Sequence, residues 1–293
     1  MRSVDFQSFV VAAVLVLAAG PEALADYPQR HKLTASDAAV ADLFGMRSAL
    51  SGSRAIVGAH LNDDAGDASG SAYVFDVRTG RELAKLTASD AEAHDLFGRA
   101  VGISGDDAVV GAPGDYQADG GSGSAYVFAS NGDGWDEVVK LTATDPLQVE
   151  SFGYAVSISG DRLVAGAPGG YGVRNNTGTA YVFERAGATW TQAAKLIAPD
   201  GGYGDSFGYA AAISGDTIIV GARYHAGGGS AYFFERDPTG WAQVAQFSRG
   251  GSRGNDYGVT VAISGNYAIV GKPGYRDNGS VYIYERLPGG WTE

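Results

Sequence analysis

Apolar and polar residues alternate along this chain in short runs that are bounded by glycine, serine and aspartate. In the run "SAYVFAS", Ala125 and Val127 point to one face of an extended segment, and Tyr126 and Phe128 point to the other. Short runs rich in Val, Ile, Tyr and Phe with this period predict β-strands. The pattern therefore predicts an all-β protein.

Two short signatures recur together five times along the chain. The first is an aromatic residue followed by glycine, at Phe44, Phe97, Phe152, Phe207 and Tyr257. The second starts with glycine and reads Gly-Ala-Pro at Gly111 and Gly166, with variants of this tripeptide at Gly58, Gly221 and Gly271. The aromatic residue and the second-signature glycine are 14 residues apart in every copy, whereas successive copies are 50 to 55 residues apart. The constant part of each repeat predicts one rigid unit.

Each repeat predicts four antiparallel strands, which in the third copy are "FGYAVSIS", "RLVAGAP", "GTAYVFER" and "TQAAKLIA". A tight "SGD"-type turn joins the first two strands, with glycine supplying a positive φ. Four short strands with two apolar faces cannot bury both faces alone, but radial stacking of such sheets does. The five repeats therefore predict a β-propeller of five four-stranded antiparallel blades.

The two ends of the chain suggest how the ring closes. The last repeat stops at Glu293, just after the Trp291 that begins its fourth strand. Near the other end, Tyr27 precedes Lys32 by five residues, which is the spacing between Trp135 and Lys140 in a fourth strand. We expect this N-terminal strand to complete the last blade and close the propeller.

Residues 1–25 have the pattern of a secretory signal peptide. Arg2 precedes an apolar run over residues 9–19, and the segment "ALA" at 23–25 fits a cleavage site. The run is short for a membrane span. We therefore expect a secreted protein, extracellular or periplasmic, cut near Ala25, with the propeller at 26–293 and no transmembrane segment.

Charge and cysteine content narrow the chemistry. The chain has 33 acidic and 21 basic residues, a formal net charge of −12, and no run of Lys and Arg. A negative surface repels phosphate backbones, so no nucleic acid partner is expected. With zero cysteines, the chain has neither disulfides nor a thiolate metal site.

The two signatures, followed by "GSAYVF", resemble the FG-GAP repeats of integrin α-subunit propellers and their bacterial relatives, over residues 27–293. The resemblance implies a β-propeller with an extracellular, adhesive or ligand-binding role. Integrin-type repeats often carry an Asp-x-Asn/Asp-x-Asp-Gly calcium loop between the first two strands. Here that place holds only "ISGD" or a variant, which has no room for six or more oxygen ligands. No cofactor is therefore expected, with calcium as the alternative, and the family's calcium site is carried over to no residue. The integrin ring has seven blades, whereas five repeats are counted here.

The connections between second and third strands are long and varied, and four of them carry a tyrosine. These residues are Tyr116, Tyr171, Tyr224 and Tyr275. Aromatic residues among Gly, Asn and Asp suit stacking on sugar rings or contact with a protein partner. The alternative is that each tyrosine packs on a neighbouring blade as a feature of the repeat.

Acidic residues give the remaining candidates. Asp63, Asp64 and Asp67 form a cluster that is not repeated, and we take them as a possible cation site, although their spacing matches no EF-type loop. Pairs five residues apart, such as Asp90 and Asp95, precede the first strands and are expected to hydrogen-bond their own loops.

These features predict a non-enzymatic module that binds an extracellular protein or glycan through the 4–1 and 2–3 connections, with no catalytic residue assigned. One alternative is a propeller enzyme acting on polysaccharide, a lyase or hydrolase, that uses acids with His94 or His225. Another alternative is a structural component of a surface or matrix.

Overall fold

The computed structural model describes residues 29–116, 123–145, 151–169, 177–250, 256–274 and 278–293. The signal-peptide prediction, Tyr171 and Tyr275 lie outside these residues. Over the described ranges the fold is all-β, with five four-stranded antiparallel sheets in which each strand pairs with the next along the chain. The prediction of five four-stranded sheets is confirmed.

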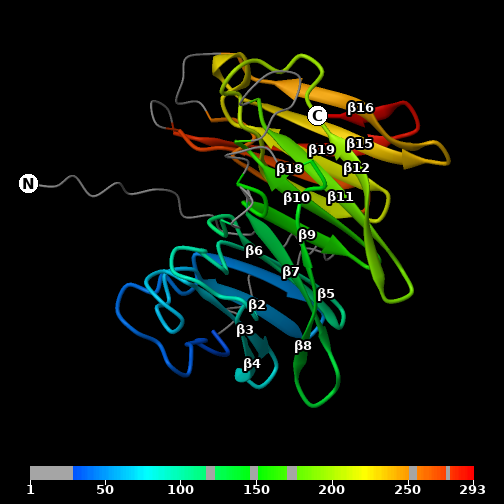
Figure 1. Cartoon of the computed structure of the whole chain (residues 1–293). Coiled ribbons are helices and arrows are strands. Elements are labelled where there is room, and N and C mark those ends of the chain that lie inside the picture. Colours follow the sequence, from blue (N-terminus) through cyan, green and yellow to red (C-terminus); the bar gives the residue numbers. More distant parts are fainter. Residues whose placement is uncertain (1–28, 117–122, 146–150, 170–176, 251–255, 275–277) are drawn as a thin grey trace, which may run out of the picture.

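Each repeat forms one sheet, which we call a blade (Figure 1). The strands are β1 Arg47–Ser51, β2 Arg54–Ala59, β3 Ser71–Asp76 and β4 Arg81–Leu86; β5 Ala100–Ser104, β6 Asp107–Ala112, β7 Ser124–Ser130 and β8 Trp135–Leu141; β9 Ala155–Ser159, β10 Arg162–Ala167, β11 Thr179–Ala186 and β12 Thr189–Leu196; β13 Phe207–Ser214, β14 Thr217–Ala222, β15 Ser230–Asp237 and β16 Gly240–Ser248; β17 Thr260–Ser264, β18 Tyr267–Lys272, β19 Ser280–Leu287 and β20 Gly290–Thr292.

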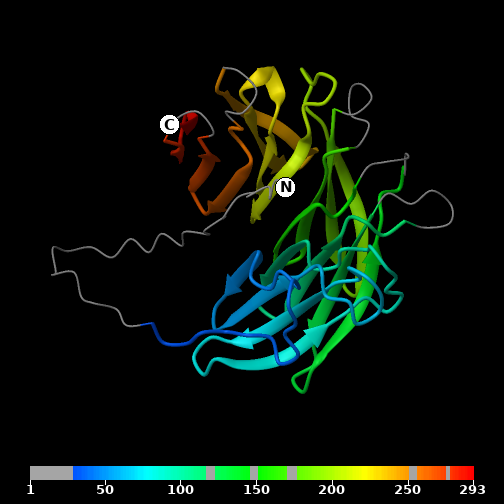
Figure 2. The same cartoon turned by 90° about the vertical axis from the view of Figure 1, so that its left-hand side faces the viewer.

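The five blades follow one another in sequence order. Their first strands lie side by side, β1 against β5, β5 against β9, β9 against β13 and β13 against β17. The first blade (blue) and the fifth blade (orange to red) stand at opposite ends of this row (Figure 2). The arrangement is consistent with a five-bladed propeller, and contact between the first and fifth blades is not shown.

The constant spacing of the two signatures has a direct cause. Within a blade, the amide of the first-signature glycine donates a hydrogen bond to the carbonyl oxygen of the second-signature glycine. The pairs are Gly45 to Gly58 at 3.1 Å, Gly98 to Gly111 at 3.1 Å and Gly258 to Gly271 at 3.0 Å. A longer or shorter first hairpin would move these groups apart, so the interval stays at 14 residues.

The same glycines also join neighbouring blades. A Cβ added to Gly111 would lie 1.9 Å from the carbonyl oxygen of Gly153 in the next blade, and one added to Gly166 would lie 2.0 Å from that of Gly208. No side chain fits such a gap, because backbone stands on its far side. We call this approach the glycine junction, and the first four blades each make it with the blade that follows.

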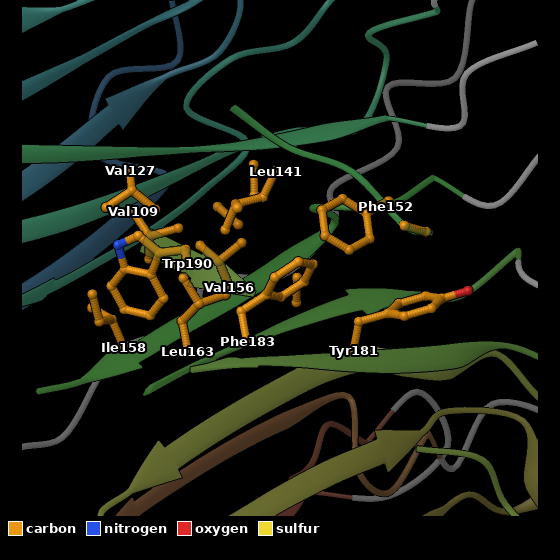
Figure 3. Packing of buried hydrophobic residues seen from close by; sticks show 14 of the residues in the cluster. Val109, Val127, Leu141, Phe152, Val156, Ile158, Leu163, Tyr181, Phe183 and Trp190 are labelled. Atoms are coloured by element: carbon orange, nitrogen blue, oxygen red, sulfur yellow. The ribbon is translucent and has the colours of Figure 1, made fainter. Parts of the chain in front are cut away.

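Aromatic rings fill the space beside each glycine junction. The ring of Phe152 is tilted against Tyr181 and lies edge-on to Phe183 of its own blade, with centroids 5.6 and 5.9 Å away. Figure 3 shows Val109 and Val127 of the second blade packed against this group and Trp190. Each blade thus buries its face against the preceding one, as radial stacking predicts.

The segment before β1 makes the same contact as the 4–1 connection between β4 and β5. The Ser36 amide donates to Oε2 of Glu82 at 2.9 Å, just as the Ser89 amide donates to Oε2 of Glu137 at 2.9 Å. Within the described residues, β19 pairs with β18 and β20 alone, and β20 is three residues long. Closure by an N-terminal strand therefore stays a prediction.

In the part of the chain that the structure describes, no helix has the length and apolar character needed to cross a membrane.

Candidate functional site

The 4–1 and 2–3 connections meet at one end of the blades, which we call the loop face. The first strand of a blade starts at this end and the second strand returns to it, so both signatures also lie there. At the opposite end, the 1–2 connections are two-residue turns such as Gly52-Ser53. Variation in loop length is therefore concentrated on the loop face, where a rigid scaffold can present binding residues.

The paired acids of the 4–1 connections hold this face together. Asp90 accepts hydrogen bonds from the Tyr126 hydroxyl at 2.7 Å and from Lys140 Nζ at 2.6 Å, while Asp95 accepts one from the Glu92 amide at 2.7 Å. Burial alone would raise the pKa of Asp90, but the bonds from Lys140 and Tyr126 outweigh it and lower that pKa. These acids therefore stabilise the fold, as their spacing predicted.

Two tyrosines of the loop face, Tyr116 and Tyr203, are largely exposed to solvent. Tyr116 has 66% of its surface exposed, whereas Tyr224 is half-buried and lies 4.8 Å from the Arg223 guanidinium. Tyr203 is 73% exposed in the 4–1 connection before the fourth blade, and the sequence analysis missed it. Its flanking residues, Gly202 and Gly204, could have indicated an exposed ring, because glycine has no side chain to cover it.

The acidic cluster at 63–67 does not gather into a metal site. Oδ1 of Asp63 accepts a hydrogen bond from the Ala68 amide at 2.8 Å, and Asp64 pairs with Lys85. Asp67 is exposed and faces His94 at 3.9 Å. Among the residues that the structure describes, no group of three or more His, Asp or Glu could hold a metal ion. The geometry lends no support to the predicted cation site.

The histidine considered for catalysis on the fourth blade has a structural environment. His225 is buried, with Nδ1 at 2.7 Å from Ser230 Oγ and Nε2 at 3.4 Å from Asp200. The order Ser–His–Asp resembles a hydrolytic triad, yet Ser230 is fully buried and shares its hydrogen bonding with Ser248 Oγ at 2.7 Å. A substrate cannot reach a buried hydroxyl, so this group ties the strand ends together.

A further group lies where the first strands begin, at the inner edge of the loop face. We call it the axial cluster and define it as Arg47, His60, Arg99, Tyr154 and Tyr209. The Arg99 guanidinium lies 4.3 Å from the Tyr154 ring centre, and the rings of Tyr154 and Tyr209 are 5.0 Å apart. The sequence analysis missed this cluster, although Arg99, Tyr154 and Tyr209 each directly follow a first signature.

The axial cluster is cationic. Burial, followed by the charges of Arg99 and Arg47, lowers the pKa of His60 to about 4, so the ring is neutral at pH 7. Burial and the nearby Arg99 also lower the pKa of Arg47. Across the described residues, the charged neighbours that shift these two pKa values include no carboxylate.

Comparison with known families agrees with the geometry. A family model described as FG-GAP repeat matches five segments, 27–75, 81–128, 135–183, 190–234 and 241–284. A search of curated proteins finds no match. The last four matched segments each begin in the fourth strand of one blade and end in the third strand of the next, and the first ends in β3 of the first blade.

Proposed function

This chain belongs to the FG-GAP repeat family, and we propose that it is a secreted, non-enzymatic binding or adhesion module for an extracellular protein or glycan. The loop face is the binding surface in this proposal. The apolar segment at the N-terminus and the absence of cysteine in the sequence support export of the chain without disulfides.

The observation that carries the proposal is the exposure of Tyr116 and Tyr203 on the loop face. Tyrosine offers a large, rigid contact area at low entropic cost, and its hydroxyl adds a hydrogen bond. The loops that bear these residues rest on blades fixed by glycine junctions, so the scaffold is ordered before the ligand arrives. A binding surface gains affinity from such order.

A structural surface or matrix component is the second candidate, and exposed apolar residues at the ends of the blade row favour it. Val281 on the fifth blade is 65% exposed and Leu50 on the first is 53% exposed. Such faces would join copies of the chain into a larger assembly. Self-assembly without ligand binding would be the mark of this function.

The test is binding of the full chain to an array of extracellular polysaccharides and matrix proteins. Alanine at both Tyr116 and Tyr203 should weaken binding at least tenfold, because about 1.4 kcal/mol corresponds to a factor of ten. Tyr267→Ala is the matched control, since Tyr267 is also exposed but lies at the 1–2 turn of the fifth blade, away from the loop face. Unchanged binding in the double variant would contradict the proposal, and so would release of new products from a polysaccharide.

A further inference from the structure

The axial cluster places two arginines together, and the described residues give them no counter-charge. Arg99 is the nearby charge that most lowers the pKa values of both Arg47 and His60, which shows that the positive groups act on one another. Arg47, Arg99, Tyr154 and Tyr209 are each half-buried, so solvent still reaches part of every side chain. Two guanidinium groups in such a position offer a fork of donors that matches an oxyanion.

Two buried nitrogens in the cluster have no hydrogen-bond partner among the described residues. They are Nη1 of Arg99 and Nδ1 of His60, and His60 is only 7% exposed. Buried polar groups in proteins nearly always have a partner, so each exception calls for an explanation. Arg99 as a whole is half-buried, unlike the fully buried Ser230, so a ligand oxygen that enters beside it would satisfy the donor left without a partner among the described residues.

The fourth blade shows what a satisfied arginine looks like at the same end of the molecule. Arg223 stands at the second-signature position that His60 occupies in the first blade. Its Nη2 lies 2.7 Å from Oδ2 of the buried Asp256, and its Nη1 donates to the Tyr209 hydroxyl at 2.9 Å. The chain supplies a carboxylate to Arg223, whereas the described residues supply none to Arg47 and Arg99.

We propose that the axial cluster binds the carboxylate of an acidic sugar, a uronate residue in a glycan presented to the loop face. The external carboxylate takes the place beside Arg47 and Arg99 that Asp256 takes beside Arg223. This inference rests on the proposed function, because the ligand reaches the cluster across the loop face.

Three observations favour a uronate among carboxylates. The formal net charge of −12 repels a densely charged polyanion, whereas uronates separated by neutral sugars bring single charges to the cluster. Tyr116 and Tyr203, exposed on the same face, offer rings for stacking on those neutral sugars. Burial raises the pKa of Tyr154 to about 12, so its hydroxyl keeps its proton and can donate to a ligand oxygen.

The test is calorimetric titration of the full chain with three small probes. D-Glucuronate carries the sugar ring and the charge, and its methyl ester carries the sugar ring alone. N-Acetylglutamate with its α-carboxyl group converted to the amide carries the free side-chain carboxylate of a protein glutamate. We expect the acid to bind at least tenfold more tightly than the ester. Arg99→Gln should remove this preference, and Arg78→Gln should keep it, because Arg78 lies on the 3–4 turn at the opposite end of the first blade.

The results that would overturn the proposal are specific. Equal binding of acid and ester by the unaltered chain would exclude a carboxylate site and needs no variant that folds. An unchanged affinity of the Arg99→Gln variant for glucuronate would also exclude a carboxylate site at the axial cluster. Arg47→Gln is a second variant, and the same result with it would have the same meaning. Tighter binding of the N-acetylglutamate amide than of glucuronate would overturn the sugar assignment and make an acidic protein the ligand.

Failure of this inference and failure of the proposed function give different results. Loss of polysaccharide binding in the Tyr116 and Tyr203 variant, with no preference for the acid over its ester, would keep the loop face and remove the axial site. If the chain binds glucuronate but binds no polysaccharide or protein on the array, the axial site is kept and the loop face is removed as a binding surface.

Discussion

The junctions between successive blades and the two ends of the blade row use the same residues in different surroundings. At an inner junction, a Cβ on Gly111 would lie 1.9 Å from the Gly153 carbonyl oxygen. At the ends, the atoms nearest to a Cβ on Gly271 all belong to Thr260 of the same blade, and among the described residues one on Gly45 would meet nothing within 4 Å. In the part of the chain that the structure describes, the ends therefore carry the two halves of a glycine junction, each without its partner.

The exposure of apolar side chains differs in the same way between the inner blades and the two ends. Val281 and Ile283 in β19 are 65% and 53% exposed, whereas Ala125 and Val127 at the same positions in β7 are fully buried. On the first blade Leu50 is exposed, and its counterpart Ile103 is buried. The faces that point outward at the two ends are the ones that pack together inside the row.

The comparison teaches that the fold is a repeated junction rather than a set of independent sheets. Each blade buries one face on the blade before it and the other on the blade after it, so an unpaired face is costly. We therefore predict that the first and fifth blades meet, as closure of a ring requires.

The largest effect is expected for valine at an inner glycine junction. Gly166→Val places a side chain against the Gly208 carbonyl oxygen, and backbone cannot move aside. We expect a loss of about 4 kcal/mol or more in unfolding free energy, measured by urea denaturation. Gly271→Val is the matched variant. Closure predicts a comparable loss for it, whereas a loss of only about 1 kcal/mol would show that this end has no neighbour.

The first-signature aromatic residues should follow the same rule. Phe152 is fully buried, so Phe152→Ala should cost about 3–5 kcal/mol in unfolding free energy. Phe44 makes the same ring contact, 5.6 Å from Tyr73, but lies half-buried at the open end. If the fifth blade covers it, Phe44→Ala should cost about as much. A cost less than half as large would contradict closure.

A smaller effect is expected where a hydroxyl links two blades. The Tyr126 hydroxyl donates to Asp90 at 2.7 Å and lies 2.8 Å from Asp115, so Tyr126→Phe should cost about 1–3 kcal/mol. Tyr282 holds this position in the fifth blade, where the connection before the blade has Gly250 in place of the first acid. Tyr282→Phe should change unfolding free energy by less than about 0.5 kcal/mol. Equal losses would show that the acid plays no part.

The smallest effect is a dependence on pH. Burial raises the pKa of Asp90, but hydrogen bonds from Lys140 and Tyr126 bring it below the ordinary value of 3.8. A carboxyl whose pKa is lowered by folding stabilises the protein above its unfolded pKa, and this stabilisation is lost as pH falls through the folded pKa. Melting temperature should therefore drop below about pH 4, and Asp90→Asn should reduce the drop. An unchanged pH profile in that variant would assign the dependence to other groups.

Much of the fold could be predicted from sequence because the repeat records its own contacts. Gly111 and Gly166 are glycines since backbone fills the place of their Cβ, so the signature is the junction itself. The axial cluster could not be predicted in this way. Arg99 and Tyr154 are 55 residues apart and meet only because successive first strands lie side by side. The pairing of Asp64 with Lys85 could not be predicted for a similar reason, because Lys85 reaches it from β4.

The most direct test of the account is the distance between the first and fifth blades. The chain has no cysteine, so Ser53→Cys and Asn266→Cys would place two spin labels on exposed 1–2 turns of these blades. The control pair, Asp161→Cys with Asp216→Cys, labels the same turns on adjacent blades. Pulsed electron paramagnetic resonance, on labelled protein diluted with unlabelled protein, should give the same short distance between the two spin labels for both pairs. A clearly longer distance for the first pair would contradict closure and leave the blades as an open row.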